Sequence, residues 1–248
     1  VAGCMAQLYQ AYKELNGNVN PPSDLMKCVV LNSADDLGNP GPDFKHGWGE
    51  INVLKGLSIL ENNQYQSGSI TQGSDEDHIL NIPAGTKEIN IMVYWHDKEA
   101  STNASIALVN DLDISLTSPS GSVTLPWVLD PTPNSSILNT PATQGVDDLN
   151  NMEQITIKNP PPGTYILTVN GTAVPYGPQQ YFMTYEIQSS EITLTYPIGG
   201  EGLVPGEFEL IRWDATDDSY PFVLEYTIDN GINWNIINNN VGVNSTFY

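Results

Sequence analysis

The residues best suited to chemistry are carboxylates that alternate along one short segment. In Asn110-Asp111-Leu112-Asp113 the two aspartates are two positions apart, so in a β-strand their side chains point to the same face. Neighbouring carboxylates repel each other unless a cation lies between them, and the chain has 8 Lys and Arg against 29 Asp and Glu. Calcium prefers carboxylate and carbonyl oxygens. The pattern therefore predicts a structural calcium site.

A second group of oxygen-bearing side chains follows at 147–153, and it completes the same cage or forms its own. The spacing is not that of an EF-hand loop. The alternative is a solvated acidic edge in which Asn and Asp cap turns. The predicted metal ligands are Asp97, Asn110, Asp111, Asp113, Asp148, Asn151 and Glu153.

Catalytic residues are not predicted in this chain. Neither Cys4 nor Cys28 lies in the sequence context of a catalytic histidine or asparagine, which argues against a thiol nucleophile. We expect two buried free thiols, although a disulfide between them stays open. His46 lies in a glycine-rich loop and is expected to be structural or exposed, and His96 is expected to be exposed. No Ser–His–Asp set can be assembled from these residues.

The composition limits the possible partners. The 248-residue chain has a formal net charge of -21, which excludes general binding to a nucleic-acid backbone. Such a charge attracts cations and suits a salty extracellular medium. No run approaches the roughly 18 apolar residues that a membrane-spanning helix needs. We expect a protein that is secreted or at the cell surface.

The hydrophobic pattern changes period along the chain. It predicts helices over 1–15, 23–34 and 51–60, with a loop at 35–49. From Gln66 short alternating segments separated by Gly, Pro and Asn turns predict antiparallel strands, which form a sandwich or jelly roll. The predicted fold is mainly β with an N-terminal helical piece. The predicted domains are residues 1–62, 66–188 and 191–248.

Three motifs in the helical piece occur in a familiar order. They are Val1-Ala2-Gly3, Asn32-Ser33-Ala34 and Gly47-Trp48-Gly49-Glu50-Ile51-Asn52. This order resembles the last stretch of a subtilisin-like serine protease domain. The resemblance implies that residues 1–62 are the C-terminal helices of an α/β catalytic domain, and that its catalytic triad lies upstream of Val1.

The β-regions carry two further resemblances. The segments 94–97, 108–113, 118–121, 150–153 and 162–165 resemble the C-terminal β-domain of a subgroup of bacterial subtilases, and also the P domain of proprotein convertases. The segments 197–201, 211–215 and 226–234 resemble part of an immunoglobulin-like module that is common on secreted bacterial proteins.

These resemblances imply the C-terminal portion of a secreted, calcium-dependent, subtilisin-like serine endopeptidase. The intact enzyme would hydrolyse protein or peptide substrates through a serine acyl-enzyme, and this chain alone would be inactive. Two alternatives stay open. One is a non-catalytic secreted protein whose sandwich binds carbohydrate or protein, and the other is a structural surface protein.

Overall fold

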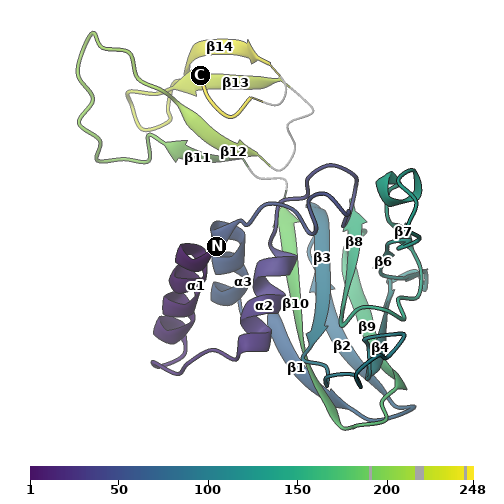
Figure 1. Cartoon of the computed structure of the whole chain (residues 1–248). Helices are drawn as coiled ribbons and strands as arrows, with labels where there is room; N and C mark the ends of the chain where they lie inside the picture. Colours follow the sequence, from purple (N-terminus) through teal and green to yellow (C-terminus); the bar gives the residue numbers. More distant parts are fainter. Residues whose placement is uncertain (190–191, 216–220, 243–244) are drawn as a thin grey trace. The chain divides into compact units, whose positions relative to one another are not determined.

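The computed structural model describes residues 1–189, 192–215, 221–242 and 245–248. These form two compact units, Val1–Ile187 and Gln188–Tyr248. The prediction of a mainly β chain with N-terminal helices and antiparallel sheets is confirmed (Figure 1). None of the helices in the described residues has the length and apolar character needed to span a bilayer.

Two four-stranded sheets pack face to face in the first unit. Apart from the β4–β5 hairpin, successive long strands alternate between the two sheets, which is the connectivity of a jelly roll. In spatial order, one sheet holds β1 (Tyr65–Ile70), β10 (Gln179–Ser189), β3 (Thr86–Trp95) and β8 (Met152–Lys158), and the other holds β2 (Asp75–Ile82), β9 (Gly163–Ala173), β4 (Asp111–Thr117) and β5 (Val123–Thr124). The long connection between β5 and β8 contains β6 (Trp127–Val128), the 3-10 helix η1 (Ile137–Asn139) and β7 (Thr143–Gln144).

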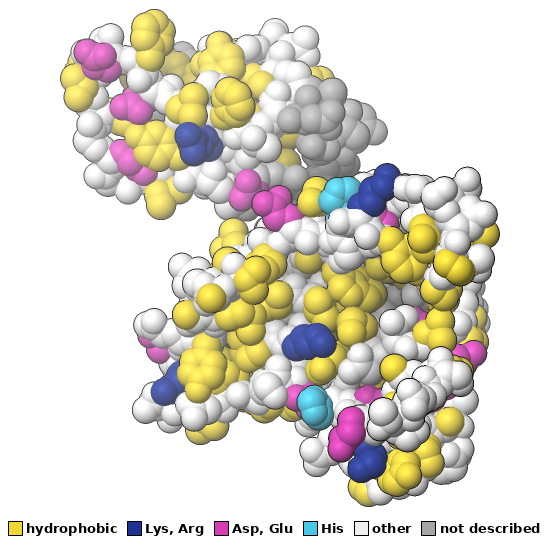
Figure 2. All heavy atoms as spheres, in the orientation of Figure 1, with side chains coloured by type: hydrophobic (Ala, Val, Ile, Leu, Met, Phe, Trp, Pro, Cys, Tyr) yellow, Lys and Arg dark blue, Asp and Glu magenta, His cyan; other side chains and the backbone are white. Residues whose placement is uncertain are grey.

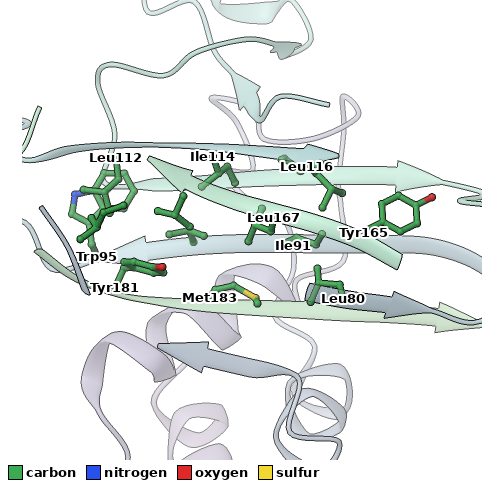
Figure 3. Close-up of a cluster of buried hydrophobic side chains, with 14 of the residues drawn as sticks. Leu80, Ile91, Trp95, Leu112, Ile114, Leu116, Tyr165, Leu167, Tyr181 and Met183 are labelled. Atoms are coloured by element: carbon green, nitrogen blue, oxygen red, sulfur yellow. The ribbon is translucent and has the colours of Figure 1, made fainter. Parts of the chain in front are cut away.

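The main core lies between the two sheets. In β4 every second residue is buried, so Leu112, Ile114 and Leu116 face inward while the aspartates face the other way. Figure 3 shows these three leucine and isoleucine side chains in a row, with Trp95 at one end of the cluster and Tyr165 at the other. The Trp95 indole donates from Nε1 to the Asn110 carbonyl at 2.8 Å. This bond anchors the chain just before the two aspartates.

Three helices cover the outer face of the first sheet where the sequence placed them. They are α1 (Ala2–Leu15), α2 (Ser23–Asn32) and α3 (Val53–Glu61). Because α2 packs on β3 (Figure 1), most of that strand is buried on both faces. The Asn32 amide crosses this junction, donating to the carbonyls of Asn90 at 3.1 Å and Thr184 at 3.4 Å.

The helices and the sandwich therefore share one compact unit. The division into 1–62 and 66–188 as separate domains stays a prediction about independent folding. Buried α2 residues such as Cys28 pack on Met92 and Tyr94 of β3. A sandwich without the helices would expose this apolar patch.

The loop at 35–50 is closed by a backbone pair between Asp35 and Glu50, with N···O distances of 2.8 and 2.9 Å. Gly49 has φ +113°, and a Cβ there would lie 2.0 Å from the Asp35 carbonyl oxygen, so this position requires glycine. Asn52 then caps α3 by accepting from the Lys55 N–H at 3.0 Å. At Gly47, by contrast, a Cβ would meet no atom within 4 Å, so glycine is favoured there only by the positive φ of +63°.

The second unit is small, and its described residues form two two-stranded antiparallel sheets. Its core is the cluster of Trp213, Phe222 and Val241, in which the Trp213 and Phe222 ring centroids are 5.3 Å apart. The predicted domain start at residue 191 lies outside the described residues. The strands are β11 (Ile192–Tyr196), β12 (Arg212–Ala215), β13 (Phe222–Tyr226) and β14 (Asn235–Val241).

Candidate metal centre

Carboxylates that are distant in the sequence come together where β3 ends and where β4 and β8 begin. Burial raises the pKa of Asp111 to about 6, and the negative charges of Asp113, Asp148, Asp147 and Asp97 add to the effect. Charges perturb one another in this way only when they are close in space. The structure therefore places the two predicted acidic groups in the same region of the sandwich.

Glu153 of β8 is the most buried member, with a relative exposure of 0%. Its Oε2 accepts a hydrogen bond from the Ile114 N–H at 2.8 Å, which ties β8 to β4 across the sandwich. Burial, followed by the nearby charges of Asp113, Asp147 and Asp111, raises the pKa of Glu153 well above its usual value, although the Ile114 bond lowers it. A buried carboxylate among like charges is costly.

Three carboxylate oxygens in this cluster are buried without a partner among the described residues. They are Oδ1 of Asp111, Oδ1 of Asp113 and Oε1 of Glu153. Buried polar atoms almost always have a hydrogen-bond partner or bind an ion. A bound cation that prefers oxygen ligands, such as calcium, would satisfy these three anionic oxygens.

The side chains are not already arranged as a closed cage. Within the described ranges, no three His, Cys, Asp or Glu side chains meet the geometry of a metal site. A bound ion would have to draw the carboxylates together or take part of its ligands from backbone carbonyls. The predicted calcium site and its ligand set therefore stay predictions.

Three of the predicted ligands have structural roles that the sequence does not show. Asp97 accepts from the N–H groups of Val109 at 2.7 Å and Asn110 at 2.8 Å, which closes the loop before β4. The Asn110 amide donates to the Tyr176 carbonyl and to the Gln179 side chain. The Asn151 amide donates to the Trp95 carbonyl at 2.7 Å. These bonds hold the loops that frame the cluster.

Asp148 is exposed beside the cluster, whereas Asp147, which is outside the predicted ligand set, is 4% exposed. Asp147 accepts from the Leu149 and Asn150 N–H groups and from the Asn150 amide. An aspartate followed by polar residues is the usual signal for such a turn, so the sequence did contain evidence for its role.

The histidines and cysteines lie elsewhere. His46 is 3.4 Å from Asp43 Oδ2, and buried His78 is 2.9 Å from Gln66 Oε1 and 2.7 Å from the Tyr181 hydroxyl. Both cysteines are free. Cys28 is buried as expected, but Cys4 is only partly buried because α1 packs through one side alone, so that expectation is wrong.

Comparison with known proteins gives one distant similarity at the sequence level. The chain is 28% identical over 193 residues to the serine protease/ABC transporter B family protein tagA of Dictyostelium discoideum. The match covers 71% of this chain and 11% of that protein, so the chain spans a small part of its relative. No family model matches.

Two solved structures share features with about half of the chain. The lipase BlEst2 of Bacillus licheniformis, in its propeptide form, is 15% identical with a TM-score of 0.32, and the match covers 50% of this chain and 21% of the lipase. The periplasmic inhibitor of g-type lysozyme PliG of Aeromonas hydrophila is 14% identical with a TM-score of 0.26, covering 50% and 84% of the two chains. Similarities at this level establish neither a shared fold nor a shared function.

Proposed function

We propose that this chain is the non-catalytic C-terminal portion of a secreted subtilisin-like serine endopeptidase that acts on protein or peptide substrates. The observation that carries the proposal is the similarity over 193 residues to a protein named as a serine protease. The order of the subtilase-like motifs in both the helices and the sandwich supports it. In this proposal residues 1–62 are the last helices of the catalytic domain, and its nucleophile lies in the part of that domain upstream of Val1.

The helices supply independent support. The 14-residue helix α1 buries one residue, Leu8, and a Cβ on Gly3 would meet no atom within 4 Å. Leu54 of α3 is 66% exposed, and Figure 2 shows hydrophobic side chains over much of the face that carries the helices. Exposed apolar side chains gathered on a face favour packing against another part of a protein. We infer that the upstream part of the catalytic domain covers this face.

The acidic cluster would then have a stabilising role. Asp111, Asp113 and Glu153 have the unpartnered oxygens and would hold the calcium ion, with Asp148 beside them. The ion would supply positive charge and link β4 to β8, and it would take no part in hydrolysis. Asp97, Asn110 and Asn151 would keep the surrounding loops in place.

The first experiment tests activity. The purified 248-residue chain is incubated with casein and with a fluorophosphonate probe that labels activated serines. We expect neither hydrolysis nor labelling, because this chain has no assigned serine nucleophile, whereas the parent protein extended upstream should give both. Labelling and hydrolysis by this chain alone would refute the proposal.

The second experiment tests the helix face in the extended parent protein. Amide hydrogen exchange should be slower in α1 of the parent than in this chain alone. Gly3→Leu should lower the peptidase activity of the parent, whereas Gly202→Leu, a matched change at a glycine whose Cβ would also meet nothing, should not. Equal exchange in both proteins would show that no domain covers this face, and would favour the alternative of a non-catalytic binding protein.

A further inference from the structure

A cavity lies between the loop at 35–50 and the segment that runs from β6 to β8. These segments enclose a cavity of about 330 Å³, which is within the range of small-ligand pockets. We call it the aromatic cup. The side chains that define it are Phe44, Trp48, Trp127, Asp43, Asp147 and Asn150.

The aromatic rings of the cup are partly exposed to solvent, and contacts with neighbouring residues fix the ring of Trp127. Trp127 donates from Nε1 to Thr156 Oγ1 at 3.2 Å. Its ring lies against Gly41, where a Cβ would approach to 3.0 Å and where φ is +76°. Phe44 is 49% exposed although it lies beside other apolar groups. A preformed group of partly exposed aromatic rings is a binding surface that needs little rearrangement.

Two aspartates with fixed carboxylates line the cup. Asp43 is 5% exposed and accepts from the N–H groups of Lys45 at 2.8 Å, His46 at 2.7 Å and Asn39 at 3.2 Å. These bonds hold the pKa of the Asp43 carboxyl well below its usual range. Asp147 accepts three hydrogen bonds from its own loop. Neither carboxylate forms an ion pair with Lys or Arg within the described ranges.

The chemistry of the cup favours a cation over a sugar. Aromatic faces attract ammonium and guanidinium groups, and fixed carboxylates add to that attraction. A carboxylate has about four acceptor positions, and those of Asp43 are taken by three backbone N–H groups and the His46 ring. Asp43 therefore offers charge to a ligand but no free acceptor for a hydroxyl group.

We infer that the aromatic cup binds a lysine or arginine side chain presented by a protein or peptide partner. The chain's net charge of -21 attracts basic partners over longer distances. This role goes beyond the proposed stabilising function, and it holds whether or not the chain works beside a peptidase.

The test uses small cationic probes on the whole chain. Nα-acetyl-lysine amide and Nα-acetyl-arginine amide are titrated by NMR and by tryptophan fluorescence, with the neutral Nα-acetyl-norleucine amide as the comparison. We expect saturable binding of the two cationic probes that weakens as salt is added. The neutral probe should bind about tenfold or more weakly.

Two variants locate the binding. Phe44→Ala should weaken the cationic probes by about fivefold, since one cation–aromatic contact contributes about 1 kcal/mol. Phe208→Ala, at a phenylalanine that is fully exposed in the second unit, should leave the affinity unchanged. Asp147→Asn keeps an acceptor oxygen for the loop, and it should weaken the cationic probes without changing the binding of the neutral probe.

Three outcomes would overturn the inference. Equal binding of the lysine and norleucine amides would make the cup an unspecific apolar pocket. Saturable binding of a neutral oligosaccharide with no binding of the cationic probes would make it a carbohydrate site. An affinity that Phe44→Ala and Asp147→Asn leave unchanged would place the binding of the cations elsewhere.

Discussion

Removal of the Glu153 charge should stabilise the metal-free protein. In Glu153→Gln the side-chain oxygen can still accept from the Ile114 N–H, a bond of 2.8 Å in the structure, and an uncharged NH₂ group replaces Oε1, which is buried without a partner among the described residues. An unsatisfied buried polar group costs about 1–3 kcal/mol. We therefore expect the variant without calcium to gain about 1–3 kcal/mol, or roughly 2–12 °C in Tm for a unit of this size.

Calcium, by contrast, should stabilise wild type more than Glu153→Gln. A ligand that binds only the folded state at a hundredfold excess over Kd adds about 2.7 kcal/mol, which is roughly 5–11 °C for this unit. Wild type should show a shift of this order. Glu153→Gln should lose most of it, and Asp111→Asn/Asp113→Asn should also lose most of it while the metal-free protein becomes no less stable.

The assay is thermal unfolding of the whole chain followed by circular dichroism and calorimetry, with chelator and then with millimolar calcium. Glu61→Gln, at an exposed residue of α3, is the matched control and should change neither Tm. If Glu153→Gln is less stable than wild type in chelator, the account of the cluster as an electrostatic conflict is wrong. A full calcium shift in both carboxylate variants would show that these oxygens are not the ligands.

Three further outcomes follow from packing and titration. Gly68→Ala should cost about 1–3 kcal/mol in urea unfolding, because its Cβ would lie 2.2 Å from the Tyr181 hydroxyl; an unchanged midpoint would contradict this. Burial lowers the pKa of His78, so its stabilising effect is complete above its unfolded pKa of about 6.5 and is lost as pH falls. His78→Gln should therefore reduce the loss of Tm between about pH 7.5 and 5.5, and a steeper loss would be the contrary result. Burial raises the pKa of the Cys28 thiol to about 12, so iodoacetamide at about pH 8 should modify Cys4 first, and mass spectrometry would show any reversal of that order.

The fold was largely predictable from the sequence because its signals are local. Alternating residues define the strands, and their number and turns predict a sandwich. The two sheets and their jelly-roll order agree with that prediction. The helix at Ala2–Leu15 also matches closely. The burial of its side chains was not predictable in the same way. The exposure of Cys4 depends on which side of α1 packs against the rest of the unit, and the sequence does not show that side.

The candidate centre was predictable in part. The repulsion between Asp111 and Asp113 is visible in their spacing alone. The burial of Glu153 and its bond to the Ile114 N–H are not visible, because that contact joins β4 and β8, which are far apart in the sequence and lie in different sheets. The aromatic cup had no sequence signal at all, since Phe44 and Trp127 meet only after the loop at 35–50 has folded onto the sandwich.

The Asn32 amide also determines which part of this chain can be transplanted. One side chain donates to carbonyls of β3 and β10, and its Oδ1 accepts from the Gln154 amide of β8 at 3.0 Å, so it fastens α2 to three neighbouring strands. A protease that cut the turn between α3 and β1 would leave a nicked but associated protein, because these bonds and the buried α2 contacts cross the cut. A fusion that is meant to carry the jelly roll to another protein should therefore begin before Ser23 rather than at Tyr65.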